Sequence, residues 1–244
     1  MNISFENKRI LVTGAGSGIG NGIATRLIKA GGTVIAVDRS KENLEKFKEA
    51  YPSIEIVVAD IGDWKNTQES IKAALPVDLL VNCAGLDKVL SVPEITEDAF
   101  QAIFNVNIKG MIAITQVVVN DLLERNKPGS IVNISSKAST SGLLYQSLYC
   151  ASKGAVDAFT RSVAVELGPK NIRINCVNPT VVLTELGIRA WSDPIRKKAV
   201  LDRIPLQRFA EVDEVADVVL YLLSDKSSMV TGHCLAVDGG YLAA

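Results

Sequence analysis

The stretch Arg9-Ile10-Leu11-Val12-Thr13-Gly14-Ala15-Gly16-Ser17-Gly18-Ile19-Gly20 decides the fold of this chain. Its first residues form a short apolar run typical of a buried strand, and a helical pattern follows from Asn21 to Ala30. Glycines between a strand and a helix allow a tight turn and close approach to a phosphate, which also meets the positive end of the helix dipole. We therefore predict a dinucleotide-binding turn, with cofactor contacts from Gly14, Ser17, Gly18, Ile19 and Gly20.

Strand-like apolar runs alternate with helical patterns along the whole chain. The runs are 9–13, 33–38, 54–59, 78–82, 130–134, 171–177 and 234–238. Because they are continuously apolar, they indicate a parallel sheet that is covered on both faces, and right-handed crossovers make it doubly wound. We predict an α/β fold in which residues 1–244 form one domain. This is a doubly wound Rossmann fold with a seven-stranded parallel sheet flanked by helices, and residues 183–206 form a partly helical flap over the substrate.

Side chains suited to ligand binding follow the ends of these strands. Doubly wound sheets bind ligands at the carboxyl ends of their strands, so residues there should share one edge and form a dinucleotide cleft. The small-residue break Cys83-Ala84-Gly85 would let a cofactor lie against the backbone. The cofactor contacts predicted beyond the glycine turn are Asp38, Arg39, Asp60, Ile61, Asn82, Ala84, Gly85, Pro179, Val182 and Thr184.

Asp38 bears on the choice of cofactor. A carboxylate at the end of the second strand can accept hydrogen bonds from the adenosine ribose hydroxyls, and it would repel a 2′-phosphate. The neighbouring Arg39 could instead hold a 2′-phosphate or stack on the adenine, while Ser17 leaves the glycine turn without a basic residue. NAD(H) is therefore favoured, and NADP(H) remains the alternative.

Composition excludes several classes of function. The 244 residues include 26 Lys and Arg against 27 Asp and Glu, for a net charge of −1. No basic stripe suggests a nucleic-acid partner, and neither a basic amphipathic helix nor an apolar run of about 18 residues suggests a membrane. Four widely spaced cysteines without a CxxC pair favour reduced thiols in a cytoplasmic protein over disulfides or a metal site.

The single histidine, His233, restricts the possible chemistry further. A Ser-His-Asp or Cys-His mechanism would have to use this residue, and no G-x-S-x-G elbow accompanies it. Tyr149 and Lys153 instead lie four residues apart in a helical run, so their side chains share one face. Ser136 directly follows a strand run. The strand end and the helix could therefore bring a hydroxyl, a phenol and an ammonium to one point.

Taken together, these motifs resemble those of the short-chain dehydrogenase/reductase family over essentially the whole chain. Within that family, the chain is most similar to the dicarbonyl and L-xylulose (carbonyl) reductases. One departure is Cys83, which replaces the second Asn of the usual Asn-Asn-Ala-Gly. The matching motifs are Thr13-Gly14-x-x-x-Gly18-x-Gly20, Asn82-Cys83-Ala84-Gly85, Asn107, Ser136, Tyr149-x-x-x-Lys153, Pro179 and Val237-Asp238-Gly239-Gly240.

The resemblance implies a role for each catalytic candidate. Tyr149 would be the acid/base, with its pKa lowered by the ammonium of Lys153 and by the charge of the oxidised nicotinamide. Ser136 would hydrogen-bond the carbonyl oxygen. Lys153 would also hold the nicotinamide ribose, alongside Tyr149. Asn107, in a predicted helix running from Thr96 to about Arg125, would order a water that relays protons.

The implied reaction is hydride transfer between a nicotinamide cofactor and a small carbonyl or secondary alcohol, either a dicarbonyl or a sugar or polyol such as L-xylulose and xylitol. A steroid or acyl-thioester substrate, or a non-catalytic dinucleotide-binding protein, are the alternatives. By the same resemblance we expect a homotetramer. The residues expected on the substrate side are Ser136, Lys137, Leu143, Gln146, Tyr149 and Trp191.

Overall fold

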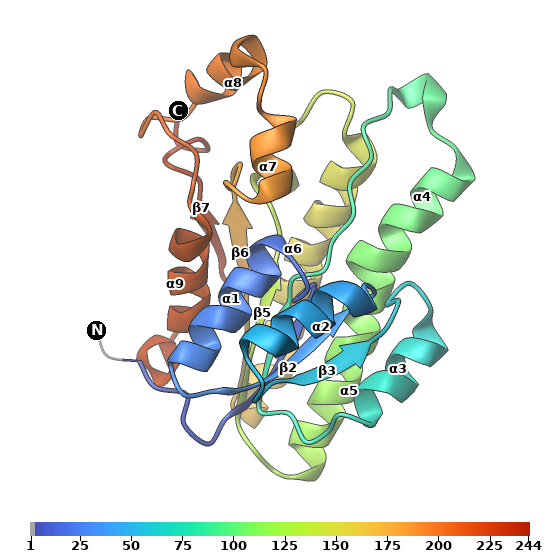
Figure 1. The fold of residues 1–244 in the computed structure, drawn as a ribbon, viewed down its shortest axis with the longest axis vertical. Coiled ribbons are helices and arrows are strands. Elements are labelled where there is room, and N and C mark those ends of the chain that lie inside the picture. The colour runs from blue at the N-terminus through green and yellow to red at the C-terminus, as the bar shows by residue number, and fades with distance from the viewer. Residues whose placement is uncertain (1–2) are drawn as a thin grey trace.

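The computed structural model describes residues 3–244, apart from the side chains of Leu186, Arg189, Ala190 and Arg196. Seven parallel strands form one sheet in the order β3-β2-β1-β4-β5-β6-β7, which confirms the predicted doubly wound architecture (Figure 1). The strands are β1 (Arg9–Thr13), β2 (Thr33–Asp38), β3 (Glu55–Val58), β4 (Leu79–Asn82), β5 (Gly129–Ile134), β6 (Ile172–Pro179) and β7 (Cys234–Val237).

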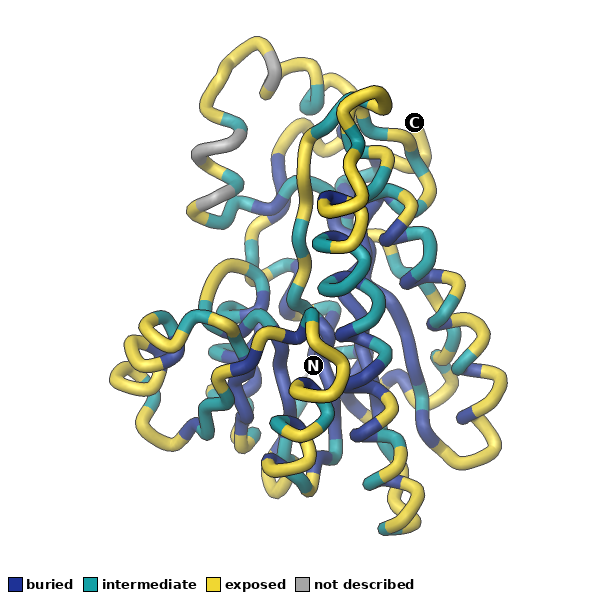
Figure 2. The backbone as a smooth tube through the Cα atoms, turned by 90° about the vertical axis from the view of Figure 1, so that its right-hand side faces the viewer, coloured by how far each residue is buried: buried dark blue, intermediate teal, exposed yellow. Residues whose placement is uncertain are grey.

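Helices cover both faces of the sheet. On one face lie α1 (Gly18–Lys29), α2 (Lys41–Ala50) and α9 (Val212–Leu223). On the other lie α3 (Trp64–Lys72), α5 (Met111–Glu124) and α6 (Ser147–Leu167), with α4 (Glu97–Phe104) packed against α6. Figure 2 shows the result as dark-blue strands in the interior and yellow outer turns of the helices.

The two-sided cover explains why the strand sequences are continuously apolar. Successive side chains of a strand point to opposite faces of the sheet. In β1, Ile10 and Val12 join the apolar cluster under α1 and α9, whereas Leu11 joins the cluster under α3 and α5. All three side chains are fully buried, and each such burial stabilises the fold by about 1.5–3 kcal/mol.

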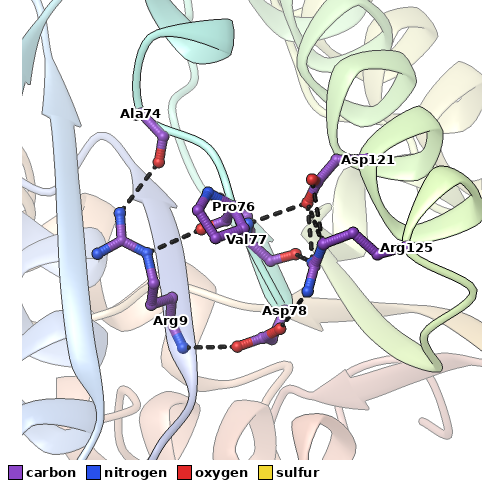
Figure 3. A network of polar contacts seen from close by, with 7 residues as sticks. All are labelled: Arg9, Ala74, Pro76, Val77, Asp78, Asp121 and Arg125. Carbon is purple, nitrogen blue, oxygen red and sulfur yellow. Dashed lines mark hydrogen bonds and ion pairs between the residues drawn. The ribbon is translucent and has the colours of Figure 1, made fainter.

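An ion-pair network ties the strands together at their amino ends, away from the glycine turn (Figure 3). The Arg125 guanidinium donates to Asp78 at 3.0 Å, to Asp121 at 2.8 Å and to the carbonyl oxygen of Val77 at 2.5 Å. The other Asp78 oxygen accepts the backbone N–H of Arg9 at 3.0 Å. The network therefore joins the ends of β1, β4 and α5.

The helix expected from Thr96 to about Arg125 is not uniform. Thr96 caps it as predicted, accepting the N–H of Ala99 at 3.1 Å, but residues Asn105–Gly110 form a π-helical segment between α4 and α5. Among the described residues, the 28-residue span Glu97–Glu124 is long and apolar enough to cross a membrane by length and composition alone, with a hydropathy of 1.5. Half of its most apolar window is buried in the fold, as in a core helix.

The flap expected at 183–206 is partly helical, as predicted. It contains α7 (Glu185–Ala190) and α8 (Pro194–Leu201), which lie above the carboxyl ends of the strands (Figure 1). Trp191 anchors it by packing against Phe209, with ring centroids 5.9 Å apart, in a small apolar cluster with Ile204 and Tyr241.

Candidate active site

The glycine turn is a tight cradle that only glycine can form at two positions. Gly14 has a φ of +68°, which favours glycine, and a Cβ there would lie 3.0 Å from the backbone of Ala84. A Cβ on Gly20 would lie 2.2 Å from the carbonyl oxygen of Gly14. The Thr13 hydroxyl holds the turn against the segment after β4, since it accepts the N–H groups of Cys83 and Ala84 at 3.0 and 3.1 Å. This backbone surface fits the pyrophosphate of a nicotinamide dinucleotide at the start of α1.

Asp38 is held in a fixed orientation beside this turn. Its Oδ2 atom accepts the N–H of Gly16 at 3.0 Å and its Oδ1 atom accepts the N–H of Ser40 at 2.9 Å. Each carboxylate oxygen keeps further acceptor capacity toward the cleft, which Asp38 and the exposed Arg39 both line. The geometry therefore suits recognition of ribose hydroxyls.

One cleft of about 620 Å³ runs along the carboxyl ends of the strands, within the size range of small-ligand sites. Thr184 of the flap reaches over the turn, since a Cβ on Gly18 would lie 3.4 Å from its methyl group. Two predicted cofactor residues, Asn82 and Val182, lie outside the lining. The predicted residues that do line the cleft are Gly14, Ser17, Gly18, Ile19, Gly20, Asp38, Arg39, Asp60, Ile61, Ala84, Gly85, Ser136, Tyr149, Lys153, Pro179 and Thr184.

Asn82 instead has a structural position behind the cleft. Its amide donates to the Thr115 hydroxyl at 3.0 Å and to the Asn133 side chain at 2.9 Å, and it is buried. Val182 is also buried and pairs its backbone with Ala210. Asn82 is the last residue of β4 and Val182 follows β6, so position along the strand alone does not distinguish a residue that faces the cleft from one beneath it.

Ser136, Tyr149 and Lys153 come together at one end of the cleft, as their spacing predicted. Ser136 follows β5, is 7% exposed, and accepts the N–H of Ala138 at 3.1 Å. Lys153 is buried, with its Nζ atom 5.6 Å from the centroid of the Tyr149 ring. The same Nζ donates to the carbonyl oxygen of Ile134 at 2.8 Å, which aims the ammonium past the end of β5.

Burial shifts the ionisation of both Tyr149 and Lys153. Burial raises the pKa of Tyr149 to about 12, and the hydrogen bond with Ser136 only partly opposes this shift. Burial also lowers the pKa of Lys153. Desolvation disfavours the charged forms of both side chains. Tyr149 is therefore a neutral phenol near pH 7, the form that can donate a proton.

Asn107 lies in the π-helical segment, and its amide is fully engaged. It donates to the Leu86 carbonyl oxygen and to the Ser152 hydroxyl, both at 2.9 Å, and its oxygen accepts the N–H of Leu86 at 2.7 Å. Its oxygen would lie 3.7 Å from a Cβ on Gly85, and the Lys153 Nζ 3.5 Å from the same point. Asn107 thus fixes the loop after β4 against α6, beside Lys153.

The residues predicted on the substrate side, other than Ser136 and Tyr149, do not line the cleft itself. Gln146 lies at its mouth, where it hydrogen-bonds the lining residue Asp87. Leu143 is part of the same loop. Lys137 points to the C-terminal segment, with its ammonium 3.4 Å from the ring centroid of Tyr241, and Trp191 packs in that region against Phe209.

Asp87 is the most notable lining residue that the sequence reasoning missed. Burial raises the pKa of this carboxyl, while its hydrogen bond with Gln146 lowers it. Its position shortly after β4, directly beyond the Cys83-Ala84-Gly85 break, was the available signal. The other lining residues not predicted are Val37, Ala59, Cys83, Leu86, Val106, Ile134, Ser135 and Thr180, most of which are neighbours of predicted ones.

Comparisons with known proteins show which family the whole chain resembles. Residues 14–242 match a family model described as Enoyl-(Acyl carrier protein) reductase. The chain is 49% identical to L-xylulose reductase from Bos taurus and 41% identical to carbonyl reductase [NADPH] 2 from Sus scrofa, with 100% of each chain covered in both cases. A gluconate 5-dehydrogenase from Burkholderia cenocepacia in complex with NADP and tartrate superposes with a TM-score of 0.94 at 28% identity, covering 100% of this chain and 98% of that one.

The chain therefore belongs to the short-chain dehydrogenase/reductase family. It is an oxidoreductase that uses a nicotinamide cofactor, and it is similar over its full length to L-xylulose and carbonyl reductases.

Proposed function

We propose that this protein reduces small ketoses and α-dicarbonyl compounds, with Tyr149 as the proton donor. The observation that carries the proposal is the meeting of Ser136, Tyr149 and Lys153 at one end of the cleft that also contains the glycine turn. A nicotinamide dinucleotide bound along this cleft supplies the hydride. The chain's own residues must then orient the carbonyl group and deliver one proton to its oxygen.

Each of the three residues has a distinct task in this proposal. The Tyr149 phenol, kept protonated by burial, donates its proton to the carbonyl oxygen as charge develops there. The Ser136 hydroxyl donates a hydrogen bond to the same oxygen and stabilises that charge. Lys153 uses one ammonium hydrogen on Ile134 and keeps the others for the ribose of the cofactor and the phenolate left on Tyr149.

Asn107 acts as a positioning residue in this scheme. Its amide hydrogens are engaged by Leu86 and Ser152, so a water relay between Lys153 and solvent would use its second oxygen lone pair or neighbouring backbone groups. Loss of the amide would loosen the segment after β4 that carries Asp87.

Two observations support a small polar substrate. Asp87 and Gln146 place a hydrogen-bonded acid and amide at the mouth of the cleft, where they can meet substrate hydroxyl or carbonyl groups. The relatives named for L-xylulose and for carbonyl compounds match this chain over its full length. An acyl thioester, which the description of the matched family model would suggest, is the second candidate.

For the cofactor, we propose a preference for NAD(H). The support is the fixed Asp38 carboxylate, whose charge would lie close to a 2′-phosphate. One relative is named for NADPH, and three similar structures hold NADP while another is in complex with NADH, so the preference would be a property of this chain's own residue 38.

The proposal is tested by steady-state kinetics with NAD(H) and NADP(H) on a panel of substrates. With the reduced cofactors the panel contains L-xylulose, diacetyl, a crotonyl thioester and a keto-steroid, and with the oxidised cofactors it contains xylitol. We expect the highest kcat/KM for L-xylulose or diacetyl with NADH. Turnover of the thioester alone would contradict the proposed substrate class, and no turnover of any compound would favour a non-catalytic dinucleotide-binding protein.

We also propose that the chain forms a homotetramer in the cytoplasm. The support is apolar surface on the long helices: Val165 on α6 is 80% exposed, and the stacked pair Phe100 and Phe104 on α4 leaves Phe100 45% exposed. All four cysteines are free thiols, as a reducing compartment would keep them. Light scattering after size-exclusion chromatography tests this assembly. We expect a tetrameric wild type and a weaker tetramer in Val165→Glu. A monomeric wild type would contradict the proposal.

A further inference from the structure

Two cysteines and an aspartate converge behind the active site, in a place that the mechanism does not use. Cys176 on β6 and Cys234 on β7 are direct partners in the parallel strand register at the edge of the sheet. Both lie next to Asp157 on α6. The two Sγ atoms and one carboxylate oxygen of Asp157 all lie within 4.8 Å of one another.

The Asp157 carboxylate is buried and only half satisfied. It is 3% exposed, and its Oδ2 atom accepts a hydrogen bond from the Asn178 amide at 2.9 Å. Its Oδ1 atom is buried without a hydrogen-bond partner. An unpaired carboxylate oxygen in the interior is costly, so this atom is available for a further positive ligand.

Two polar side chains lie beside the two sulfur atoms. Arg161 donates to the Cys234 Sγ at 3.7 Å, and the Thr160 hydroxyl lies 3.0 Å from the Cys176 Sγ. With both thiols and Asp157 ionised, and Arg161 positive, the net charge of the group is −2, which a divalent cation would neutralise.

We propose that this group binds a thiophilic divalent cation, Zn²⁺ or Cd²⁺, through Cys176, Cys234 and Asp157. Zinc takes thiolate and carboxylate ligands at about 2.3 and 2.0–2.2 Å, and two tetrahedral thiolates around it lie about 3.8 Å apart. The ligand atoms lie within 4.8 Å of one another. To bind zinc, the two sulfur atoms would therefore approach each other by at most about 1 Å, and each sulfur and the carboxylate oxygen by at most about 1.2 Å. The Thr160 hydroxyl or a water completes the tetrahedron. This site runs against the expectation from sequence, where the cysteine spacing showed no metal motif.

The test is a metal titration of the full-length protein after chelator treatment under reducing conditions. Binding of Cd²⁺ is followed by its thiolate charge-transfer absorption in the ultraviolet, and binding of Zn²⁺ by competition with a chromophoric chelator. We expect one ion per chain. Cys234→Ser should weaken binding by about 100-fold or more, and Asp157→Asn by about 10-fold or more. Cys150→Ser, which removes a thiol outside the group, should bind like the wild type.

Three results would overturn the proposal. One is the absence of a charge-transfer band in the wild type. Another is equal affinity in the wild type and Cys234→Ser, which would place the metal elsewhere. The third is a reduced protein that binds no metal but forms a Cys176–Cys234 disulfide when a disulfide oxidant is added. Circular dichroism of each variant establishes that lost binding is not lost folding. Since Cys234 is partly exposed, its serine variant is the one expected to fold unchanged.

Discussion

The Nζ atom of Lys153 lies 5.6 Å from the ring centroid of Tyr149, and it donates a hydrogen bond to the Ile134 carbonyl oxygen at 2.8 Å. The ammonium is therefore near the phenol but is held by the end of β5. Burial is the largest influence on the Tyr149 phenol and raises its pKa to about 12, so this side chain stays protonated. The placement of Lys153 separates the two tasks of the site: Tyr149 carries the proton, and Lys153 organises the charges around it.

Replacing Asp38 by asparagine should shift the cofactor preference toward NADPH. The substitution Asp38→Asn keeps the size of the side chain and removes the charge that would oppose a 2′-phosphate. We expect the ratio of kcat/KM for NADPH to that for NADH to rise by roughly 10- to 100-fold, equivalent to about 1.4–2.8 kcal/mol.

The control for this experiment is Glu45→Gln, which removes an exposed carboxylate from α2, outside the cleft lining. It should leave the ratio unchanged. If the wild type already prefers NADPH strongly, Arg39 rather than Asp38 determines the choice of cofactor.

Removing Arg125 should destabilise the fold without altering the active site. Arg125→Met leaves Asp78 and Asp121 without their cation, and the Asp121 side chain is only 10% exposed. We expect the free energy of unfolding to fall by roughly 2–3 kcal/mol, with kcat of the folded enzyme unchanged because the network lies at the amino ends of the strands.

Urea denaturation of Arg125→Met is compared with that of Arg208→Met. Arg208 pairs with Glu214, and both side chains are substantially exposed, so its loss should cost less than about 1 kcal/mol. Equal losses for the two variants would show that burial of the network contributes nothing.

Lys137 should make stability rise with pH in the alkaline range. Burial lowers the pKa of Lys137 from 10.5 to about 8. Between these values the folded protein binds fewer protons than the unfolded chain, so the free energy of unfolding contributed by this group rises with pH. The rise is up to about 3 kcal/mol, an upper limit because the Tyr241 ring stabilises the ammonium.

The measurement is the difference in unfolding free energy between the wild type and Lys137→Met at about pH 7 and about pH 10. Other groups that titrate in this range are common to both proteins and cancel. We expect the wild type to gain on the variant as the pH rises. Parallel stabilities at the two pH values would mean that Lys137 stays protonated in the folded state.

Most of the fold could be predicted because it depends on local patterns. Continuous apolar strands such as 9–13 indicate burial on both faces of the sheet. The glycine turn indicates a backbone conformation that favours glycine, as the positive φ of Gly14 shows. The cluster of Ser136, Tyr149 and Lys153 follows from strand ends and helical spacing together.

The rest depends on contacts between segments that are distant in sequence. The sequence does not reveal that the Asn107 amide is engaged by Leu86 and Ser152, or that Lys137 packs on Tyr241. In the sequence, Cys176 and Cys234 are distant thiols, and only the pairing of β6 with β7 places them side by side. Spacing shows that an ammonium lies near Tyr149, but not the extent of burial that raises the pKa of this phenol.

The central claim, that Tyr149 donates the proton, is tested most directly by Tyr149→Phe. The variant loses one hydroxyl, and Tyr145→Phe, which makes the same change at a 53% exposed tyrosine on the preceding loop, is the control. The measurement is kcat for reduction of L-xylulose or diacetyl, together with the Kd for NADH by fluorescence. We expect Tyr149→Phe to lower kcat by about 10²- to 10⁴-fold with a much smaller change in Kd, and Tyr145→Phe to match the wild type. Turnover by Tyr149→Phe at the wild-type rate would contradict the account.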